Sequence, residues 1–339
     1  MIDRRNFLAK LSGLTAGILI PNPSFPEESR IYRDKWGELL PMRKLGKTGE
    51  NVTMLGLGGY HIGWTMEKDA IETIEAAMEG GIRFFDTAEA YGPNISEERY
   101  GKFLTPKYRD QIYLMTKTLA KDAKTAKEHL EGSLKRLNTD HLDLWQAHAI
   151  TSKEDAEGRI NNGVFEFMQE AKASGKVRHI GFTGHTNARA HAYLLDRLKS
   201  EGFLETVQMP VNPVDAAHNV SFVNQVIPKA SKQNYGILAM KTLAGGQFFA
   251  KKLELEEKKW ETDDPVVPGR ISLVDTINFV WSLPVSVLIT GASTRDMVNE
   301  KINLAKNHHA LNETARKNLI DKVVDISLKE KVEYYRNRS

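Results

Sequence analysis

The stretch Ile82-Arg83-Phe84-Phe85-Asp86-Thr87 decides the fold prediction, because it is a short run of β-branched and aromatic residues that ends in polar ones. Such a run predicts a β-strand. The pair Gly80-Gly81 precedes it, and a helix that begins at Ser96-Glu97-Glu98 follows it. A strand followed by a helix indicates a parallel sheet, because a parallel connection needs a crossover long enough to hold a helix.

The same unit recurs along the chain from Met42 onward. The predicted strands are Val52–Leu57, Ile82–Thr87, Ile112–Lys117, Leu142–His148, Val177–Thr183, Thr206–Asn212, Gly236–Thr242 and Val285–Thr290. The predicted helices are Ala70–Glu79, the segment that begins at Ser96, Thr125–Leu137, Gly163–Ala173, Thr186–Leu198, Val220–Gln233, Ile271–Leu283 and Arg295–Lys306. Eight units over roughly 280 residues predict an α/β fold of the (β/α)8 TIM-barrel type. An open doubly wound sheet is the alternative, but Gly56-Leu57-Gly58-Gly59-Tyr60 lacks the Gly-x-Gly-x-x-Gly spacing typical of that fold.

The composition excludes several kinds of chemistry. The 339 residues carry 47 basic and 44 acidic side chains, a formal net charge of +3, and the two signs are interspersed. This mixture argues against a nucleic-acid partner. The chain has no cysteine, which excludes disulfides, thiolate metal sites and a cysteine nucleophile. We predict no metal site, so the chemistry depends on oxygen and nitrogen groups.

The N-terminus resembles a twin-arginine export signal, with Arg4-Arg5 ahead of the apolar stretch Leu11–Ile20. That stretch is about half as long as a membrane-spanning helix, so we expect no permanent membrane span. The predicted organisation is a signal segment at 1–20, a linker at 21–41, a barrel at 42–325 and a C-terminal tail at 326–339. This interpretation predicts export by the twin-arginine machinery to the periplasm. A cytosolic amphipathic helix is the alternative for the N-terminus.

Four residues lie where three consecutive predicted strands end, namely Asp86, Tyr91, Lys117 and His148. The C-terminal ends of barrel strands meet at one face, so these side chains can converge. A carbonyl that accepts a hydride develops negative charge on its oxygen, and Tyr91 can donate a proton there as general acid. The ammonium of Lys117 favours the phenolate of Tyr91, Asp86 compensates the lysine charge, and His148 can hold the carbonyl oxygen. We therefore predict that all four are catalytic.

Each of the four also has a structural interpretation when it is taken alone. A histidine at a strand end is more often structural, a loop tyrosine usually packs, and an Asp–Lys pair is commonly only an ion pair. Their order on three adjacent strands favours the joint catalytic interpretation.

The chain resembles an aldo-keto reductase from about Met42 to about Leu319. The matching stretches are Arg43-Lys44-Leu45-Gly46-Lys47-Thr48-Gly49 with Leu55-Gly56-Leu57-Gly58, Asp86-Thr87-Ala88 through Tyr91-Gly92, and Gly175-Lys176-Val177-Arg178-His179-Ile180-Gly181. The resemblance implies NADP or NAD lying across the barrel mouth, and hydride transfer between this cofactor and a carbonyl or secondary alcohol of a small molecule. It also implies the roles given above for the four catalytic residues.

The resemblance implies a set of cofactor contacts as well. They are Gly59, Tyr60, Thr183, Gln208, Met240, Lys241, Leu243, Gly245, Gly291, Ser293 and Arg295. Gln208 and Thr183 match the residues that hold the nicotinamide carboxamide, a group that presents both a donor and an acceptor. The loop from Met240 to Gly246 resembles the one that covers the pyrophosphate with backbone N–H groups. A glycine-rich connection is the alternative for any single residue in it.

Several positions depart from the family pattern. Gly184 stands where many members have Asn, and Met240 replaces an aromatic residue that often stacks on the nicotinamide. Gly291 and Met297 stand where some relatives have Lys and Arg for the adenosine 2′-phosphate. Arg295 is then the cation left near that phosphate, so NAD is favoured more than in the family at large.

The substrate side is predicted from position. His148 and Trp64, in the loop after the first strand, are expected to border the substrate, although packing on the barrel rim is the alternative for Trp64. Asn161, Asn212 and His185 lie near strand ends and suit a hydroxylated, carbohydrate-like molecule. The charged segment Lys251–Asp264 predicts a surface insertion, with a lid over the cofactor as the alternative.

Two other functions stay open at this point. One is a non-catalytic nicotinamide-binding module that senses redox state. The other is a barrel lyase or isomerase with Lys117 as a Schiff-base nucleophile, against which the Gln208 and Thr183 matches argue.

Overall fold

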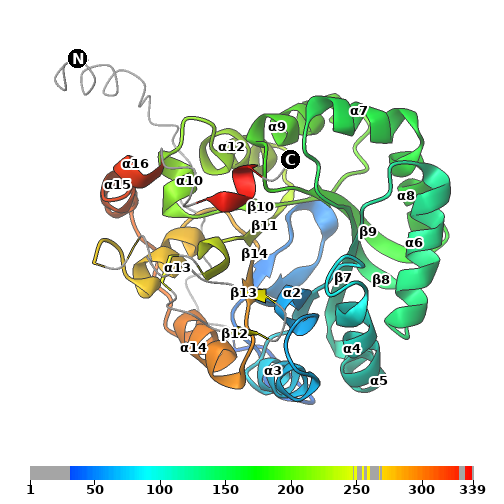
Figure 1. The fold of residues 1–339 in the computed structure, drawn as a ribbon, viewed down its shortest axis with the longest axis horizontal. Helices are drawn as coiled ribbons and strands as arrows, with labels where there is room; N and C mark the ends of the chain where they lie inside the picture. Colours follow the sequence, from blue (N-terminus) through cyan, green and yellow to red (C-terminus); the bar gives the residue numbers. More distant parts are fainter. Residues whose placement is uncertain are drawn as a thin grey trace.

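The computed structural model describes residues 31–246, 248–249, 254–255, 258–259, 267, 269–327 and 333–337. Its core is a closed barrel of parallel strands in the order β5, β6, β7, β8, β9, β10, β11 and β14, with helices around the outside (Figure 1). The bounds are Leu55–Gly58, Phe84–Asp86, Tyr113–Thr118, Leu142–Ala147, Val177–Thr183, Thr206–Pro210, Gly236–Met240 and Val287–Gly291. The predicted (β/α)8 barrel is therefore confirmed.

The first predicted strand, Val52–Leu57, is divided in the structure. Its first part, β4 (Asn51–Thr53), pairs antiparallel with β3 (Met42–Lys44), and only β5 enters the barrel. The turn of this hairpin carries Leu45 into a buried cluster with barrel side chains such as Phe84 and Leu144. The hairpin therefore supplies side chains to the barrel core, which the apolar pattern of one continuous strand did not reveal.

The helices that follow the barrel strands lie close to the predicted ranges. They are α3 (Glu67–Glu79), α4 (Ile95–Phe103), α6 (Ala123–Arg136), α8 (Val164–Ala173), α9 (Ala188–Arg197), α13 (Leu273–Trp281) and α14 (Arg295–Lys306). Side-chain caps fix several N-termini, as where Asp122 accepts a hydrogen bond from the backbone N–H of Thr125 over 2.9 Å. The prediction of a single helix at Val220–Gln233 is wrong. It is two helices, α11 (Phe222–Gln225) and α12 (Ile227–Lys232), because Pro228 lacks the N–H that would continue the first.

Short helices in the connections were not predicted. They are α2 (Gly59–Ile62), α5 (Thr105–Tyr108), α7 (Lys153–Asn161), α10 (Pro213–Ala217), α15 (Glu313–Asp321) and α16 (Val324–Ser327), with 3-10 turns at Gly46–Thr48, Arg109–Gln111, Ala244–Gly246 and Tyr334–Asn337. Most are too short for a helical apolar period to be recognised.

Part of the predicted linker is attached to the barrel. Within 21–41, β1 (Arg33–Asp34) and β2 (Gly37–Glu38) form a hairpin, and Asp34 pairs with the buried guanidinium of Arg83 at 2.7 Å. The side chain of Arg83 is 5% exposed, so Asp34 provides a charge that this cation needs. The described residues of this segment are therefore held by the domain and are not a free linker.

The described residues of the predicted C-terminal tail, 326–327 and 333–337, also lie against the barrel domain. The 3-10 turn Tyr334–Asn337 lies beside α10, where the red end of the chain is visible in Figure 1. Arg336 forms an ion pair with the buried Asp215 of α10, and Asn212 donates a hydrogen bond to the Tyr335 hydroxyl over 3.1 Å. The sequence of this charged segment did not indicate which residues it contacts, because its partners are more than 100 positions away.

The signal segment at 1–20 lies outside the described residues. So does most of Lys251–Asp264, of which the backbone pair β12 (Glu254–Leu255) and β13 (Lys258–Lys259) is described. Within the described ranges, no helix is long and apolar enough to cross a membrane.

Candidate active site

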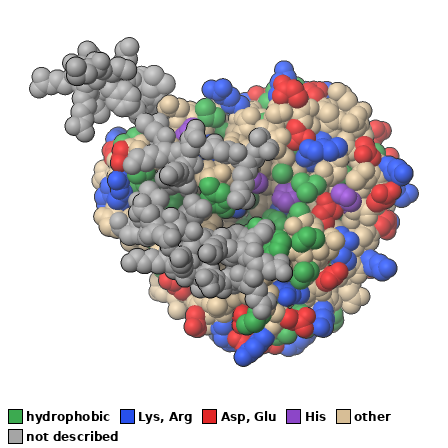
Figure 2. Space-filling model, in the orientation of Figure 1, with side chains coloured by type: hydrophobic (Ala, Val, Ile, Leu, Met, Phe, Trp, Pro, Cys, Tyr) green, Lys and Arg blue, Asp and Glu red, His purple; other side chains and the backbone are tan. Residues whose placement is uncertain are grey.

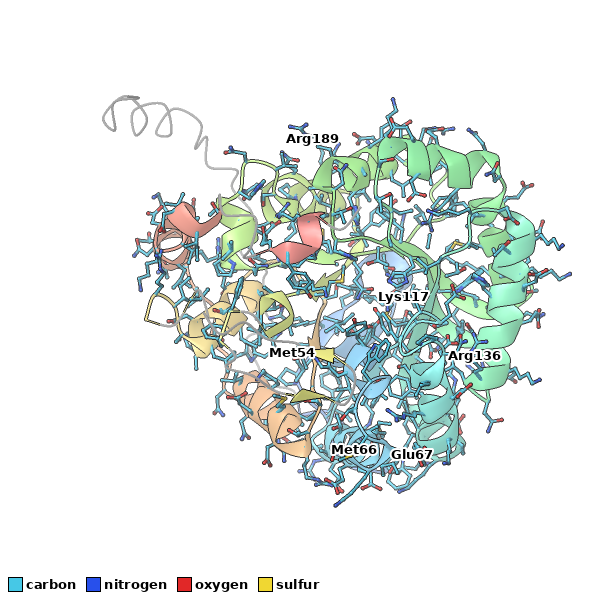
Figure 3. All side chains as sticks on the ribbon, viewed as in Figure 1. Met54, Met66, Glu67, Lys117, Arg136 and Arg189 are labelled. Atoms are coloured by element: carbon cyan, nitrogen blue, oxygen red, sulfur yellow. The ribbon has the colours of Figure 1, made fainter. Side chains whose placement is uncertain are left out.

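Two of the predicted catalytic residues, Asp86 and Lys117, lie at the C-terminal ends of barrel strands. In β7, Tyr113, Met115 and Lys117 alternate with residues that face outward, and Tyr113 and Met115 belong to the buried interior cluster. The same period of two places Asp86 above Phe84 in β6. Figure 3 shows Lys117 within the ring of strands, whereas Arg136 and Arg189 lie among the outer helices. Strand alternation therefore turns the polar ends of these strands toward one another.

The ammonium of Lys117 is surrounded by acceptors. It is 1% exposed, forms an ion pair with Asp86, and donates to the carbonyl oxygen of Thr87 over 2.7 Å and to the Tyr91 hydroxyl over 3.1 Å. Burial lowers the pKa of Lys117, and the carboxylate of Asp86 opposes that shift. The three N–H groups of the ammonium thus have one acceptor each.

The hydroxyl of Tyr91 is set up to donate its own proton. Because the Lys117 ammonium can only donate, the Tyr91 oxygen accepts that bond and its O–H is left for another acceptor. Burial, with a further effect of the Asp86 carboxylate, raises the pKa of Tyr91 well above its usual value. The phenol therefore stays protonated at neutral pH, which is the form that a general acid requires.

His148 lies against Tyr91. The two rings are 5.8 Å apart between centroids, with an interplanar angle of 83°. Burial, with the nearby charge of Lys117, lowers the pKa of His148 well below its usual value, so the imidazole is neutral. Its Nδ1 is buried and has no hydrogen-bond partner within the described part of the chain. An imidazole in this state can donate one hydrogen bond to a substrate oxygen without adding a charge.

A cavity of about 570 Å³ opens over these residues. Histidine and hydrophobic side chains gather near the centre of this face in Figure 2. Its lining includes Tyr91, His148 and Lys241, and also Gly291, Ser293, Met297 and Lys301. It is a concave, mostly apolar site with a few polar groups, as is typical of cofactor and small-molecule sites.

Gln208 fits the carboxamide role predicted for it. It lines the cavity, is 1% exposed, and its side-chain Oε1 has no partner among the described residues. Thr183 is its direct register partner in β9, but it does not line the cavity. A Cβ at Gly184 would lie 2.5 Å from the carbonyl oxygen of Ile150 and 2.6 Å from the His191 ring. The backbone therefore leaves no room here for the asparagine of many relatives.

The loop after β11 also suits a phosphate-bearing cofactor. The residues of this loop that were predicted as cofactor contacts all line the cavity, namely Met240, Lys241, Leu243 and Gly245. Gly245 and Gly246 have φ of 67° and 93°, which allows a tight turn whose backbone can approach a ligand. Thr242, which was not predicted, has a buried hydroxyl without a partner among the described residues.

After β14, Gly291 and Ser293 line the cavity but Arg295 does not. The Arg295 guanidinium pairs with Glu79 at 2.9 Å and with Glu75 at 3.9 Å, on the neighbouring helix α3. A Cβ at Gly291 would lie 2.2 Å from Nδ1 of His61, so His61 takes the space that a side chain needs there. The Arg295 guanidinium, which was predicted to bind the 2′-phosphate, therefore forms ion pairs with the neighbouring helix α3 instead.

Four other predicted contacts do not line the cavity. Gly59 begins α2 with Ser96 and Asp86 packed around it, and Trp64 stands behind Tyr60 with 6.4 Å between ring centroids. Tyr60 itself lines the cavity, so it provides the aromatic wall predicted for Trp64. Asn161 is exposed in α7, and Asn212 caps α10. Sequence position placed these side chains near strand ends but could not give their direction.

Sequence reasoning missed the cavity residues of the C-terminal segment. Tyr334 and Tyr335 line the cavity, and the centroids of the Tyr335 and His185 rings are 6.2 Å apart. The Arg336–Asp215 ion pair and the Asn212 hydrogen bond hold this segment in place. The Tyr-Tyr pair was the one signal available, because adjacent aromatics in a charged stretch are unusual unless they pack.

A parallel barrel with a buried Asp–Lys–Tyr relay and a neutral histidine over one cavity defines a site suited to carbonyl chemistry. Comparison with known proteins places the chain more closely: the family model described as "Aldo/keto reductase family" matches residues 54–321. The chain belongs to the aldo/keto reductase family. Membership implies a nicotinamide cofactor, NAD or NADP, and the cavity residues fit one.

Individual relatives agree with this assignment. Aldo-keto reductase YhdN of Bacillus subtilis (strain 168) is 34% identical over 241 residues, which cover 65% of this chain and 66% of that protein. L-galactose dehydrogenase of Arabidopsis thaliana is 29% identical over 219 residues, covering 61% of this chain and 66% of that protein. These alignments span slightly less than two thirds of the relatives' own lengths.

A solved structure supports the fold. The holo form of aldo-keto reductase AKR11C1 from Bacillus halodurans superposes with a TM-score of 0.69 at 21% identity, covering 84% of this chain and 96% of that one.

Proposed function

We propose that this protein transfers a hydride between NAD or NADP and a carbonyl or secondary alcohol of a small molecule. The observation that carries the proposal is the hydrogen bond from Lys117 to the Tyr91 oxygen, which leaves the phenol proton free for a substrate beside His148. When bound, a reduced nicotinamide supplies the hydride to the carbonyl carbon. Gln208 is the residue that would hold its carboxamide.

The residues of the chain then handle the charge that develops on the substrate oxygen. His148 donates a hydrogen bond and orients the carbonyl, and Tyr91 donates its proton as the oxygen becomes negative. The Lys117 ammonium stabilises the phenolate that remains, and Asp86 keeps that ammonium charged in a buried place. In the oxidative direction the same groups accept the proton from an alcohol.

A carbohydrate-like substrate suits the cavity. Ring faces of tyrosines can pack on the apolar face of a sugar, while His148 and His185 can hydrogen-bond its hydroxyls. The similarity to a plant protein named L-galactose dehydrogenase supports a sugar or sugar derivative.

Nucleotide binding tests the proposal and the cofactor preference together. We expect NADH to bind at least about 10-fold more tightly than NADPH, because the described residues around Gly291 and Ser293 offer the 2′-phosphate no unpaired cation. Near Gly291 and Ser293, the described lining residue Lys301 is already paired with Glu300. Arg295, which lies outside the cavity lining, is paired with Glu79 and Glu75. Fluorescence titration of the full chain with each nucleotide measures both affinities.

A matched variant checks the cause of that preference. Met297→Arg places a guanidinium on the cavity wall, and we expect it to raise NADPH affinity about 10-fold with little change for NADH. Tighter binding of NADPH by the unaltered protein contradicts the preference alone. Failure of both nucleotides to bind contradicts the proposed function.

We also propose that the protein is exported folded by the twin-arginine machinery, with its cofactor already bound. The support is the Arg4-Arg5 pair ahead of a short apolar stretch. We expect the protein in the periplasmic fraction and its Arg4→Lys/Arg5→Lys variant in the cytoplasm. An unaltered protein that stays cytoplasmic rules out this location and leaves the chemistry untouched.

A further inference from the structure

The most unusual cation of the cavity is Lys241, which directly follows β11. Its Nζ lies 5.9 Å from the ring centroid of Tyr60, 5.7 Å from that of Tyr334 and 6.0 Å from that of Tyr335. The one hydrogen bond that the ammonium makes to a described residue goes to the Tyr334 hydroxyl at 3.5 Å. The ammonium is thus surrounded by aromatic rings at the cavity wall.

This ammonium has no carboxylate within ion-pairing distance in the part of the chain that the structure describes. The other cavity-lining lysine, Lys301, is paired with Glu300, and Lys117 above the barrel core is paired with Asp86. A lysine ammonium offers three N–H donors, and a single contact at the outer limit of hydrogen bonding leaves most of this capacity unused. Ring faces attract a cation but do not neutralise it. The cavity therefore presents a positive charge that an anionic ligand can satisfy.

The position of Lys241 relates it to the reacting end of the cavity. Tyr60, one of its three rings, packs edge-on against Tyr91 with 5.2 Å between centroids. Tyr335, another of the three, packs edge-on against His185 at 6.2 Å. A ligand that reaches Tyr91 and His148 with its carbonyl can therefore extend along Tyr60 toward Lys241.

We propose that Lys241 binds an acidic group of the substrate, so that the preferred substrates are carbonyl compounds or alcohols that carry a carboxylate, such as sugar acids. This inference rests on the proposed hydride transfer and adds the substrate class. Tyr60, Tyr334 and Tyr335 pack on the carbon skeleton between the two ends, and the Arg336–Asp215 ion pair keeps two of these rings in place. The cofactor pyrophosphate is the other source of anionic oxygens within the same cavity, and the test separates the two.

The test compares matched acidic and neutral substrates. D-glucuronate and D-glucose, D-galacturonate and D-galactose, and succinate semialdehyde and butanal differ mainly in the carboxylate. With the full chain and saturating NADH, we expect kcat/KM to be about 10- to 100-fold higher for the acid in at least one pair, as for a charge-assisted hydrogen bond. Lys241→Met should remove this preference, because KM for the acid rises relative to KM for its neutral counterpart while the ratio of the two kcat values changes by less than about 3-fold.

Three controls make the outcome specific. Lys241→Arg keeps the charge and should retain a preference for the acid. Lys153 of α7 lies outside the cavity, and its Nζ is 4.8 Å from the ring centroid of Tyr193 in α9. Lys153→Met should leave kcat/KM unchanged for both the acid and the neutral substrate. The dissociation constant of NADH, measured by fluorescence without any turnover, should stay within about 2-fold in Lys241→Met.

The contrary results are distinct. If NADH binds but no acid is favoured over its neutral counterpart, the proposal is wrong. If Lys241→Met weakens NADH binding and leaves the substrate ratios unchanged, Lys241 serves the pyrophosphate and the proposal is overturned. If neither NADH nor NADPH binds the unaltered protein, the proposed function itself fails.

Discussion

The Tyr91→Phe variant is expected to reduce carbonyl substrates about 1,000-fold more slowly than the unaltered protein, within the range that a positioned general acid contributes. The change removes the only proton that Tyr91 can give, while the ring keeps its contacts with His148 and Tyr60. NADH affinity should be unchanged, because Gln208 and the loop after β11 are untouched. Single-turnover reduction and nucleotide titration measure the two effects separately.

Tyr100 offers a matched control. It is fully buried in α4, and its hydroxyl has no partner among the described residues. Tyr100 does not line the cavity, so Tyr100→Phe should leave the rate within about 2-fold. A Tyr91→Phe variant that keeps more than a tenth of the rate argues against Tyr91 as the acid. If the unaltered protein binds nucleotide but shows no turnover, the result supports a non-catalytic redox-sensing module.

The second large effect concerns the buried Asp86–Lys117 pair. Asp86→Asn and Lys117→Met each leave a charge without its partner in a place where both side chains are less than 5% exposed. We expect each to lower the free energy of unfolding by about 3 to 5 kcal/mol. Each should also slow reduction at least about 100-fold, because the relay that stabilises the phenolate is broken. Urea unfolding and steady-state kinetics measure the two losses.

The double variant separates stability from chemistry. Asp86→Asn/Lys117→Met removes both charges, so its loss of stability should be smaller than the sum of the single losses by about 2 kcal/mol. Its activity should not recover, since no ammonium remains beside Tyr91. As a control, Glu38→Gln breaks the exposed Arg33–Glu38 pair and should cost less than about 0.5 kcal/mol. Strictly additive losses at 86 and 117 contradict a coupled pair.

The relation between sequence and site differs from one residue to the next. Asp86 and Lys117 could be placed beforehand because strand alternation has only two faces, and their neighbours Phe84 and Met115 are apolar interior residues. His148 follows Gln146 of β8 by two positions, so the same alternation placed both side chains on one face of the strand. Arg295 and Trp64 could not be placed this way, because loop and helix residues have many directions and their partners, such as Glu79 and Tyr60, come from elsewhere.

The sequence by itself determined the barrel and the position of Asp86 and Lys117 at its strand ends. Eight strands with an apolar period of two residues alternate with helices of period 3.6, and few other folds bury the apolar faces of all of them. Only the tertiary structure decided how the cavity is closed. The hairpin that carries Leu45, the return of Tyr334 and Tyr335, and the ammonium of Lys241 among three rings all depend on contacts between distant parts of the chain. Such contacts have no local period, so they become visible only when the chain is folded.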